Sequence, residues 1–187
     1  MLRTRVIPCL LLDNRRLVKT VKFKNPAYIG DPVNALKIFN EIEVDELFFI
    51  DITATIQNRP PSFDLLSEMA NECFMPFSYA GGVRSIKDIR TLLSKGFEKV
   101  TINTYANENV DIISEAAKIF GSQAIVIAID FKRNVFGKYT MYTHHGTKKV
   151  KEDPIEYAKK VQDLGAGEIF LNSIDRDGTW EGYDLDL

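Results

Sequence analysis

Short apolar runs alternate along the chain with amphipathic segments, and this alternation constrains the fold more than any other feature. The runs are rich in Val, Ile and Phe and apolar on both faces, as expected for strands of a parallel sheet that helices cover. Six such runs are Val6–Leu11, Glu46–Ile52, Pro76–Ala80, Lys99–Asn103, Ala124–Asp130 and Glu168–Ile174. The sequence therefore predicts an α/β fold built from successive βα units.

Capping and turn residues mark the segments between these strands. Asp31-Pro32 and Asp153-Pro154 each place a capping carboxylate before a proline at the first helical position, and Ser85 caps a helix that ends at Gly96. Alternating aromatic residues in Arg133–Gly146 predict a hairpin inserted after the fifth strand.

An internal repeat suggests how the units are arranged. Val44–Thr55 resembles Ala166–Thr179, and Glu46 matches Glu168 at a separation of 122 residues. Two repeats of this size make a domain near the ~250 residues of a (βα)8 TIM barrel. We therefore expect residues 1–187 to form a single barrel domain with about six of the eight βα units, the carboxyl-terminal units lying outside this sequence. An open, doubly wound sheet is the alternative.

A six-unit barrel has an expected physical consequence. Its first and sixth strands keep open edges, so the chain expressed to Leu187 should be poorly soluble.

Composition excludes several classes of protein. The 187 residues are 45% hydrophobic and 27% charged, which allows one sizeable core. No apolar run reaches the roughly 18 residues of a membrane helix, so a cytoplasmic protein without a membrane partner is expected. A net charge of −2 disfavours a nucleic-acid partner. Cys9 and Cys73 lack CxxC spacing, and neither a metal site nor a cofactor is predicted.

Polar residues stand at the carboxyl ends of the strands, where a barrel carries its functional groups. Any one of them alone is more often a helix cap or a turn residue. Gly81-Gly82 and Gly178 add turns whose backbone N–H groups can approach an anion closely. Together these groups predict a phosphorylated small-molecule ligand at this face. The polar groups are Asp51, Asn103, Thr104, Asp130, Asp175 and Asp177.

Nine stretches carry a resemblance to one family: RVIPCL, VKT, GDPV, DELFFIDITAT, GGV, KVTINT, FGSQAIVIAID, GAGEIFLNSIDRDGT and GYD. Over the whole 187 residues they resemble HisF, the cyclase subunit of imidazole glycerol phosphate synthase. The resemblance implies a (βα)8 barrel that receives ammonia along its axis from a HisH-like glutaminase.

The resemblance also implies residue roles. Asp130 matches the second of two catalytic aspartates, and Lys19, in the first loop, matches a lysine that helps to hold the substrate. The matches to ligand-lining and phosphate-binding positions are Asp51, Gly81, Gly82, Asn103, Thr104, Asp177 and Gly178.

The first catalytic aspartate of the family pattern is absent. The stretch IPCLLLDN has Leu11 at its position, and Asp13 follows two residues later. In an extended strand Asp13 keeps the same side but lies roughly 6.6 Å further along, too far for a positioned acid or base to act unaltered. Asp13 is therefore a possible but not the default substitute for this acid.

Four charges at the starts of strands match the ring through which the family passes ammonia: Arg5, Glu46, Lys99 and Glu168. Spacing alone favours ordinary exposed charges, and the resemblance reverses that interpretation. Glu98 and Gln123, on the same rim, match positions that face the glutaminase.

Within the family, LLLDN, FMPFSYAGGV and YTHHGTKKVKEDP most resemble the WbuZ-type paralogues of surface-polysaccharide loci, which are associated with glycosyl amidation. The resemblance implies a subunit of a glutamine-dependent amidotransferase complex, active only within that complex, with a separate sugar amidotransferase as a further partner. Two alternatives stay open: a true cyclase of histidine biosynthesis, which is a lyase, and a noncatalytic scaffold that activates the glutaminase. His144 and His145 receive no catalytic role.

Overall fold

The computed structural model describes residues 4–187, which divide into two compact units. The first unit holds the chain up to Lys19 together with Tyr28–Val100, and the second holds Thr20–Ala27 together with Thr101–Leu187. The prediction of one domain over residues 1–187 stays a prediction.

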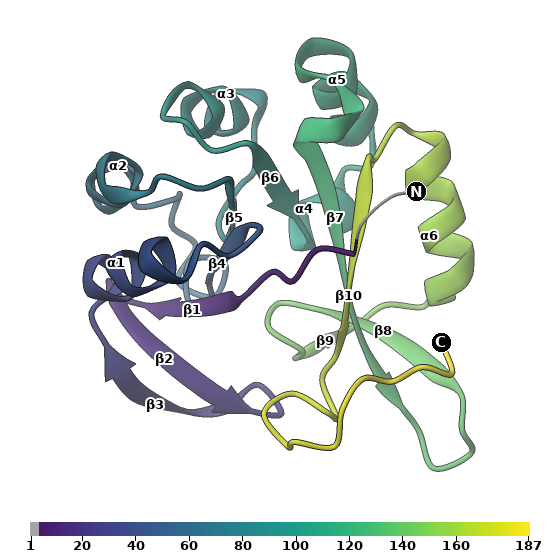
Figure 1. The fold of residues 1–187 in the computed structure, drawn as a ribbon. Coiled ribbons are helices and arrows are strands. Elements are labelled where there is room, and N and C mark those ends of the chain that lie inside the picture. Colours follow the sequence, from purple (N-terminus) through teal and green to yellow (C-terminus); the bar gives the residue numbers. More distant parts are fainter. Residues whose placement is uncertain (1–3) are drawn as a thin grey trace. The chain divides into compact units, whose positions relative to one another are not determined.

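The first unit is built on a parallel sheet. Strand β4 (Leu47–Asp51) pairs in parallel with β1 (Cys9–Asp13) on one side and with β5 (Phe77–Ala80) on the other. Helices α1 (Pro32–Ile42), α2 (Phe63–Glu72) and α3 (Ile86–Ser94) follow the strands in turn (Figure 1). Side chains shielded from water between these layers include Leu36, Leu47, Phe49, Met69, Ile89 and Leu92.

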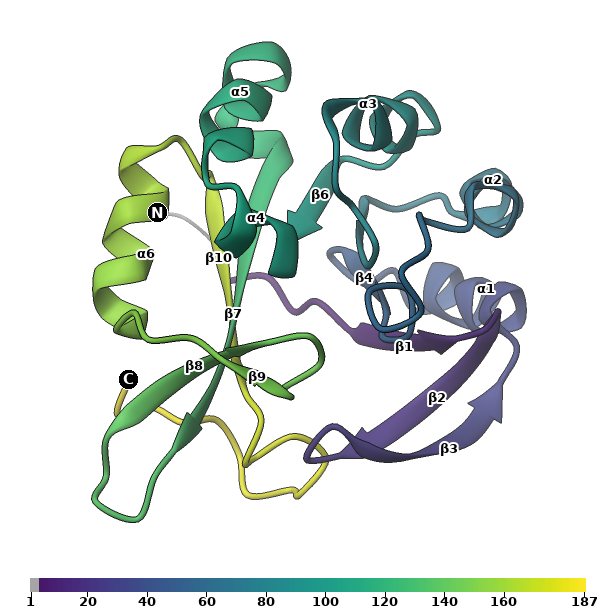
Figure 2. The same ribbon diagram turned by 180° about the vertical axis from the view of Figure 1, so that it is seen from behind.

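The second unit is centred on the long strand β7 (Ile125–Arg133). Strand β10 (Glu168–Ser173) runs parallel to β7, whereas β8 (Tyr139–Thr143) runs antiparallel to it and pairs in turn with β9 (Lys148–Lys149). Helices α5 (Asp111–Phe120) and α6 (Pro154–Asp163) pack against β7 (Figure 2). The short helices α4 (Thr104–Glu108) and η1 (Ser122–Ala124) complete the unit.

Sequence patterns predicted most of these elements. The six predicted strands are β1, β4, β5, β6 (Lys99–Ile102), β7 and β10, and the predicted hairpin is formed by β7 and β8. Asp31, Ser85 and Asp153 cap α1, α3 and α6 through their side chains, as predicted. The predicted α/β class with a mostly parallel sheet is confirmed.

The first loop was predicted less well. It contains two strands that the apolar runs did not indicate, β2 (Arg16–Val21) and β3 (Lys24–Gly30). Asn14 and Arg15, both at positive φ, form a tight two-residue turn that brings β2 back antiparallel to β1. Strand β1 is therefore paired on both sides at Leu11 and Leu12, and the expected open edge is wrong over that stretch.

Candidate functional site

The second unit places a buried carboxylate at the end of the parallel strands. Asp130 is 7% exposed, and its Oδ2 accepts a hydrogen bond of 2.7 Å from Asn103 Nδ2. Asn172, its partner in register on β10, also bonds the carboxyl group. Burial raises the pKa of Asp130 to about 7, against the opposing effect of these two hydrogen bonds. Such a group can gain or release a proton near neutral pH.

Asp177 anchors the tip of the first loop within the same unit. Its carboxylate accepts hydrogen bonds from Thr20 Oγ1 at 2.8 Å and from the Phe23 backbone N–H at 3.0 Å. The backbone N–H of Lys22 donates to the Asp177 carbonyl at 2.9 Å. The residue predicted to line the ligand thus also positions the loop that carries Phe23.

The β8–β9 turn holds the same loop from another side. The rings of Phe23 and His145 stack with centroids 5.1 Å apart, and His145 Nε2 lies 3.0 Å from the Phe23 carbonyl oxygen. Burial lowers the pKa of His145. Thr104 Oγ1, another predicted ligand position, accepts a hydrogen bond from the His144 backbone N–H at 3.1 Å.

Gly178 is required by a close backbone contact. Its φ is +66°, and an added Cβ would lie 2.2 Å from the Thr20 carbonyl oxygen. Any side chain here would push the loop after β10 away from the first loop, and with it the Asp177 contacts.

We expect Gly178→Ala to cost more stability than Gly182→Ala, although both glycines have positive φ. At Gly182, where nothing lies within 4 Å of an added Cβ, only the roughly 1–2 kcal/mol of left-handed backbone strain applies. At Gly178 overpacking adds roughly 1–3 kcal/mol. Urea unfolding of both variants measures the difference, and equal losses would contradict the close contact.

In the first unit, Asp51 is saturated by donors from its own loop. The carboxylate is buried and accepts hydrogen bonds from the backbone N–H groups of Thr53 and Ala54 at 3.1 and 3.0 Å. Arg59 makes an ion pair of 2.8 Å with Asp51 Oδ2 and also donates to Oδ1 at 2.9 Å. Arg59 was not singled out from the sequence, because nothing in its spacing ties it to Asp51.

Gly81 and Gly82 pack against that loop. An added Cβ at Gly81 would lie 2.6 Å from the Asp51 carbonyl oxygen, and one at Gly82 would lie 2.5 Å from the Arg59 carbonyl oxygen. Close packing is therefore a sufficient reason for both glycines. Their predicted role in binding an anion stays a prediction.

A buried charge cluster stands at the opposite ends of the strands. Glu46 Oε2 is 2.6 Å from Arg5 Nη1 and 2.8 Å from Lys99 Nζ. Glu46 is 2% exposed and Lys99 is 8% exposed, so these are not the ordinary exposed charges that spacing alone favoured. Glu168, the fourth predicted member, begins β10 in the second unit and is half-buried there.

Comparisons with known proteins identify a family for this chain. The family described as "Histidine biosynthesis protein" matches residues 5–187. The chain is 50% identical over 184 residues to "Putative imidazole glycerol phosphate synthase subunit hisF2" of Pseudomonas aeruginosa. The aligned stretch covers 98% of this chain and 73% of the relative. The chain belongs to the HisF family.

Two further HisF relatives show similar agreement. A protein of Leptospira interrogans named "Putative imidazole glycerol phosphate synthase subunit HisF" is 47% identical over 188 residues, covering 100% of this chain and 74% of the relative. A protein of Vibrio vulnificus named "Putative imidazole glycerol phosphate synthase subunit hisF3" is 49% identical over 187 residues, covering 100% of this chain and 72% of the relative. The parallel α/β fold of this chain is that of the HisF-type (βα)8 barrel.

The remaining predicted HisF positions lie in simpler surroundings. Leu11 is half-buried on β1 and stands opposite Ile50 of β4. Asp13 closes the β1–β2 turn, where Asn14 Nδ2 donates to its Oδ1 at 2.9 Å. Lys19 is exposed on β2. The predicted partner-facing residues Glu98 and Gln123 are both exposed.

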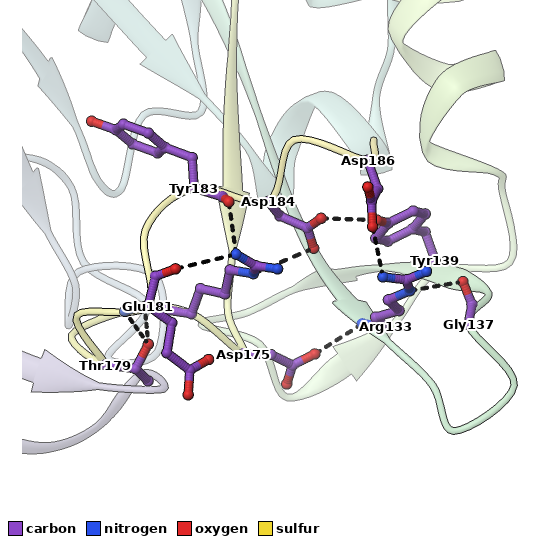
Figure 3. A network of polar contacts seen from close by, with 10 residues as sticks. Arg133, Gly137, Tyr139, Asp175, Thr179, Glu181, Tyr183, Asp184 and Asp186 are labelled. Atoms are coloured by element: carbon purple, nitrogen blue, oxygen red, sulfur yellow. Dashed lines mark hydrogen bonds and ion pairs between the residues drawn. The ribbon is translucent and has the colours of Figure 1, made fainter.

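The loop after β10 is held by Arg176, a role that sequence reasoning missed. Arg176 Nη1 donates to the carbonyl oxygens of Tyr183 and Glu181 at 2.7 and 3.4 Å. Figure 3 shows Asp184 of this loop turned toward Tyr139 of β8, whose hydroxyl donates to it at 2.9 Å. Polar contacts of this kind fix the DRDG turn that carries Asp177 and Gly178. A sequence signal for the role of Arg176 is its place between two acidic residues in SIDRDGT.

Residues 4–187 contain neither a candidate metal-ion cluster nor a candidate membrane-spanning helix. No group of three or more His, Cys, Asp or Glu side chains in residues 4–187 is placed to hold a metal ion. None of the helices described is both long and apolar enough to cross a bilayer.

Proposed function

We propose that this HisF-family chain is the ammonia-receiving subunit of a glutamine-dependent amidotransferase complex that amidates a sugar for surface polysaccharide. The observation that carries the proposal is a contrast between two sites. In the charge cluster of Arg5, Glu46 and Lys99, Glu46 and Lys99 are buried and Glu46 pairs with both cations, whereas Leu11 stands where the family pattern has its first catalytic acid.

The buried cluster suits the passage of a small neutral molecule. One carboxylate oxygen contacts two cations, so the buried carboxylate is fully paired and the three groups carry a net charge of +1. A paired cluster excludes free ions, because an ion that crosses it loses its hydration without a compensating partner. Ammonia is uncharged and carries its own donors and lone pair.

The proposed partners follow from the two ends of the strands. A HisH-like glutaminase would supply ammonia at the rim that bears the exposed residues Glu98 and Gln123. The other end of the strands in the second unit would hold a phosphorylated ligand among Asn103, Thr104 and Gly178. A sugar amidotransferase would take the nitrogen onward. The complex would work in the cytoplasm.

A histidine-pathway cyclase is the second candidate, because the relatives are named as imidazole glycerol phosphate synthase subunits. Asp130 alone, or with Asp13, would then supply the acid and base. A noncatalytic scaffold that activates the glutaminase is the third candidate. In a scaffold, ammonia from glutamine would be lost to solvent.

The charge cluster can be tested with Lys99→Met, which removes the charge and keeps most of the side-chain stem. We expect the complex to assemble and to hydrolyse glutamine, but the ratio of amidated product to glutamate should fall roughly tenfold, equivalent to about 1.4 kcal/mol of barrier. Lys118→Met, at an exposed lysine of α5, is the matched control. An unchanged ratio in Lys99→Met, measured on a folded and assembled complex, would show that the cluster does not conduct ammonia.

A further inference from the structure

Two turns of the second unit meet at their tips. Lys22 and Phe23 form the turn between β2 and β3, and His144 and His145 begin the turn between β8 and β9. The rings of Phe23 and His145 stack with centroids 5.1 Å apart and an angle of 20° between their planes. The next residue, Gly146, leaves little space beside this stack, because an added Cβ would lie 3.3 Å from Phe23. The two turns are therefore packed against each other through their aromatic side chains.

The backbone of both turns is unusual for the residues that occupy it. The φ angles are +54° at Lys22, +60° at Phe23, +51° at His144 and +57° at His145. Hairpin turns with positive φ normally use Asn and Gly, because a Cβ disfavours this region. Strained positions concentrate at ligand sites, where a particular side chain matters more than a relaxed backbone. The side chains at these four positions therefore direct attention to a ligand.

Lysines surround the stacked rings. Lys22 and Lys24 flank Phe23 in the chain, and Lys132 Nζ donates to the Gly146 carbonyl oxygen at 3.1 Å. Strand β9, which follows the second turn, consists of two further lysines. Four of the five lysines are exposed, and within residues 4–187 no carboxylate pairs with them: Lys22, Lys24, Lys148 and Lys149.

The charges around the two turns do not balance. Two carboxylates contact the turns: Asp177 accepts from the Phe23 backbone N–H at 3.0 Å, and Glu108 Oε1 lies 3.7 Å from His144 Nε2. With neutral histidines, the five lysines and these two carboxylates leave a net charge of +3, whereas the whole chain carries −2. A local excess of positive charge of this kind attracts anions.

We propose that these two turns bind a nucleoside diphosphate. Ammonium groups bind phosphate oxygens as point charges, and two adjacent phosphates match a cluster of several lysines. Phe23 and His145 are both partly exposed, and a nucleobase can extend their stack, because base–aromatic stacking tolerates any base. The inference goes beyond the proposed function, since it applies equally to a free nucleotide and to a nucleotide that carries a sugar.

Isothermal titration calorimetry of the full-length protein tests the site with uridine diphosphate, inorganic pyrophosphate and uridine. We expect saturable binding of uridine diphosphate. Pyrophosphate should bind roughly fivefold or more weakly because it cannot stack, and uridine roughly tenfold or more weakly because it lacks charge. Added sodium chloride should weaken the binding of uridine diphosphate, because salt screens exposed charges.

Uridine diphosphate N-acetylglucosamine distinguishes the two sources of the nucleotide. Binding as tight as that of uridine diphosphate indicates an activated sugar as the ligand. Binding that is roughly tenfold weaker, equivalent to about 1.4 kcal/mol, indicates a free nucleotide. Both results support a nucleotide site at the two turns.

Variants assign the binding to particular side chains. Lys148→Gln/Lys149→Gln, on the exposed strand β9, should weaken the binding of uridine diphosphate roughly tenfold or more. Lys118→Gln/Lys159→Gln removes the same charge from exposed positions of α5 and α6 and should change the affinity less than roughly twofold. Phe23→Leu should keep the binding of pyrophosphate and lose the preference for uridine diphosphate over it.

Three results would each overturn the inference. They are no saturable binding of uridine diphosphate by the wild type, pyrophosphate binding as tight as that of uridine diphosphate, and equal losses of affinity in the two lysine double variants. Failure of the proposed function is distinguishable from these results. If the complex transfers glutamine nitrogen to a sugar but uridine diphosphate does not bind, only this inference fails. If it binds and no nitrogen reaches a sugar, only the amidation function fails.

Discussion

Replacing Asp130 by asparagine is expected to stabilise the protein at pH 8 and to leave its stability almost unchanged at pH 4. Burial raises the pKa of Asp130 from 3.8 to about 7. The folded protein therefore holds a proton that the unfolded chain releases between these values. Across that window stability falls as pH rises, and the asparagine variant is spared the loss.

The size of this effect follows from the pKa difference. A shift of that size corresponds to at most ~4 kcal/mol above the upper pKa. We expect Asp130→Asn to raise the free energy of unfolding at pH 8 by roughly half of this amount or more, because the amide does not reproduce every hydrogen bond of the carboxyl group. Urea unfolding at pH 4, 6 and 8 measures it, with Asp163→Asn at an exposed position of α6 as the control. A loss of stability at pH 8, or a gain that does not depend on pH, would contradict the raised pKa of the buried Asp130 carboxyl group.

The histidine-pathway substrate, phosphoribulosylformimino-aminoimidazole-carboxamide ribonucleotide, is expected to give no imidazole product above the ammonia-only control. A positioned acid or base contributes ~10²- to 10⁴-fold to a rate, and Leu11 supplies neither. Asp13 lies at the β1–β2 turn and is engaged by Asn14, so it is a poor substitute. The assay uses the full-length protein with free ammonia.

Leu11→Asp is the informative variant of that assay. It should restore a measurable trace of product because Asp130 and Asn103 are in place, and it should lower stability because a carboxylate replaces a leucine in a mostly apolar strand. Turnover of the unmodified protein on the order of 1 per second would show that another group is the acid. This chain would then be better described as a histidine-pathway cyclase.

The sequence predicted those features that depend on local periodicity. Strands such as β4 and β7 are continuous apolar runs, and the caps at Asp31, Ser85 and Asp153 need only two or three neighbouring residues. Asp130 and Asn103 could be placed at strand ends because each directly follows such a run. Their mutual hydrogen bond follows from the fold and not from spacing.

Contacts between loops could not be predicted in this way. Strands β2 and β3 lack a continuous apolar run, because Arg16, Lys19 and Thr20 interrupt the apolar residues of β2, and β3 begins with Lys24 and Asn25 and is almost wholly exposed. The Arg59–Asp51 pair and the Arg176 contacts depend on the path of irregular backbone, for which the sequence carries no period. The packing of Gly81 and Gly82 could not be predicted either, because a GG pair in the sequence does not show whether a ligand or another loop lies against it.

Isotope transfer tests the central claim most directly. The complex of the full-length protein with its glutaminase and a sugar amidotransferase is given amide-¹⁵N glutamine in an excess of unlabelled ammonium chloride. The acceptor is the nucleotide-sugar pool from a strain that lacks this gene, and the amidated product is analysed by mass spectrometry. Conduction through the protein predicts a product enriched in ¹⁵N despite the unlabelled excess, and lower enrichment with Lys99→Met. A product whose nitrogen matches the bulk ammonium would contradict the account.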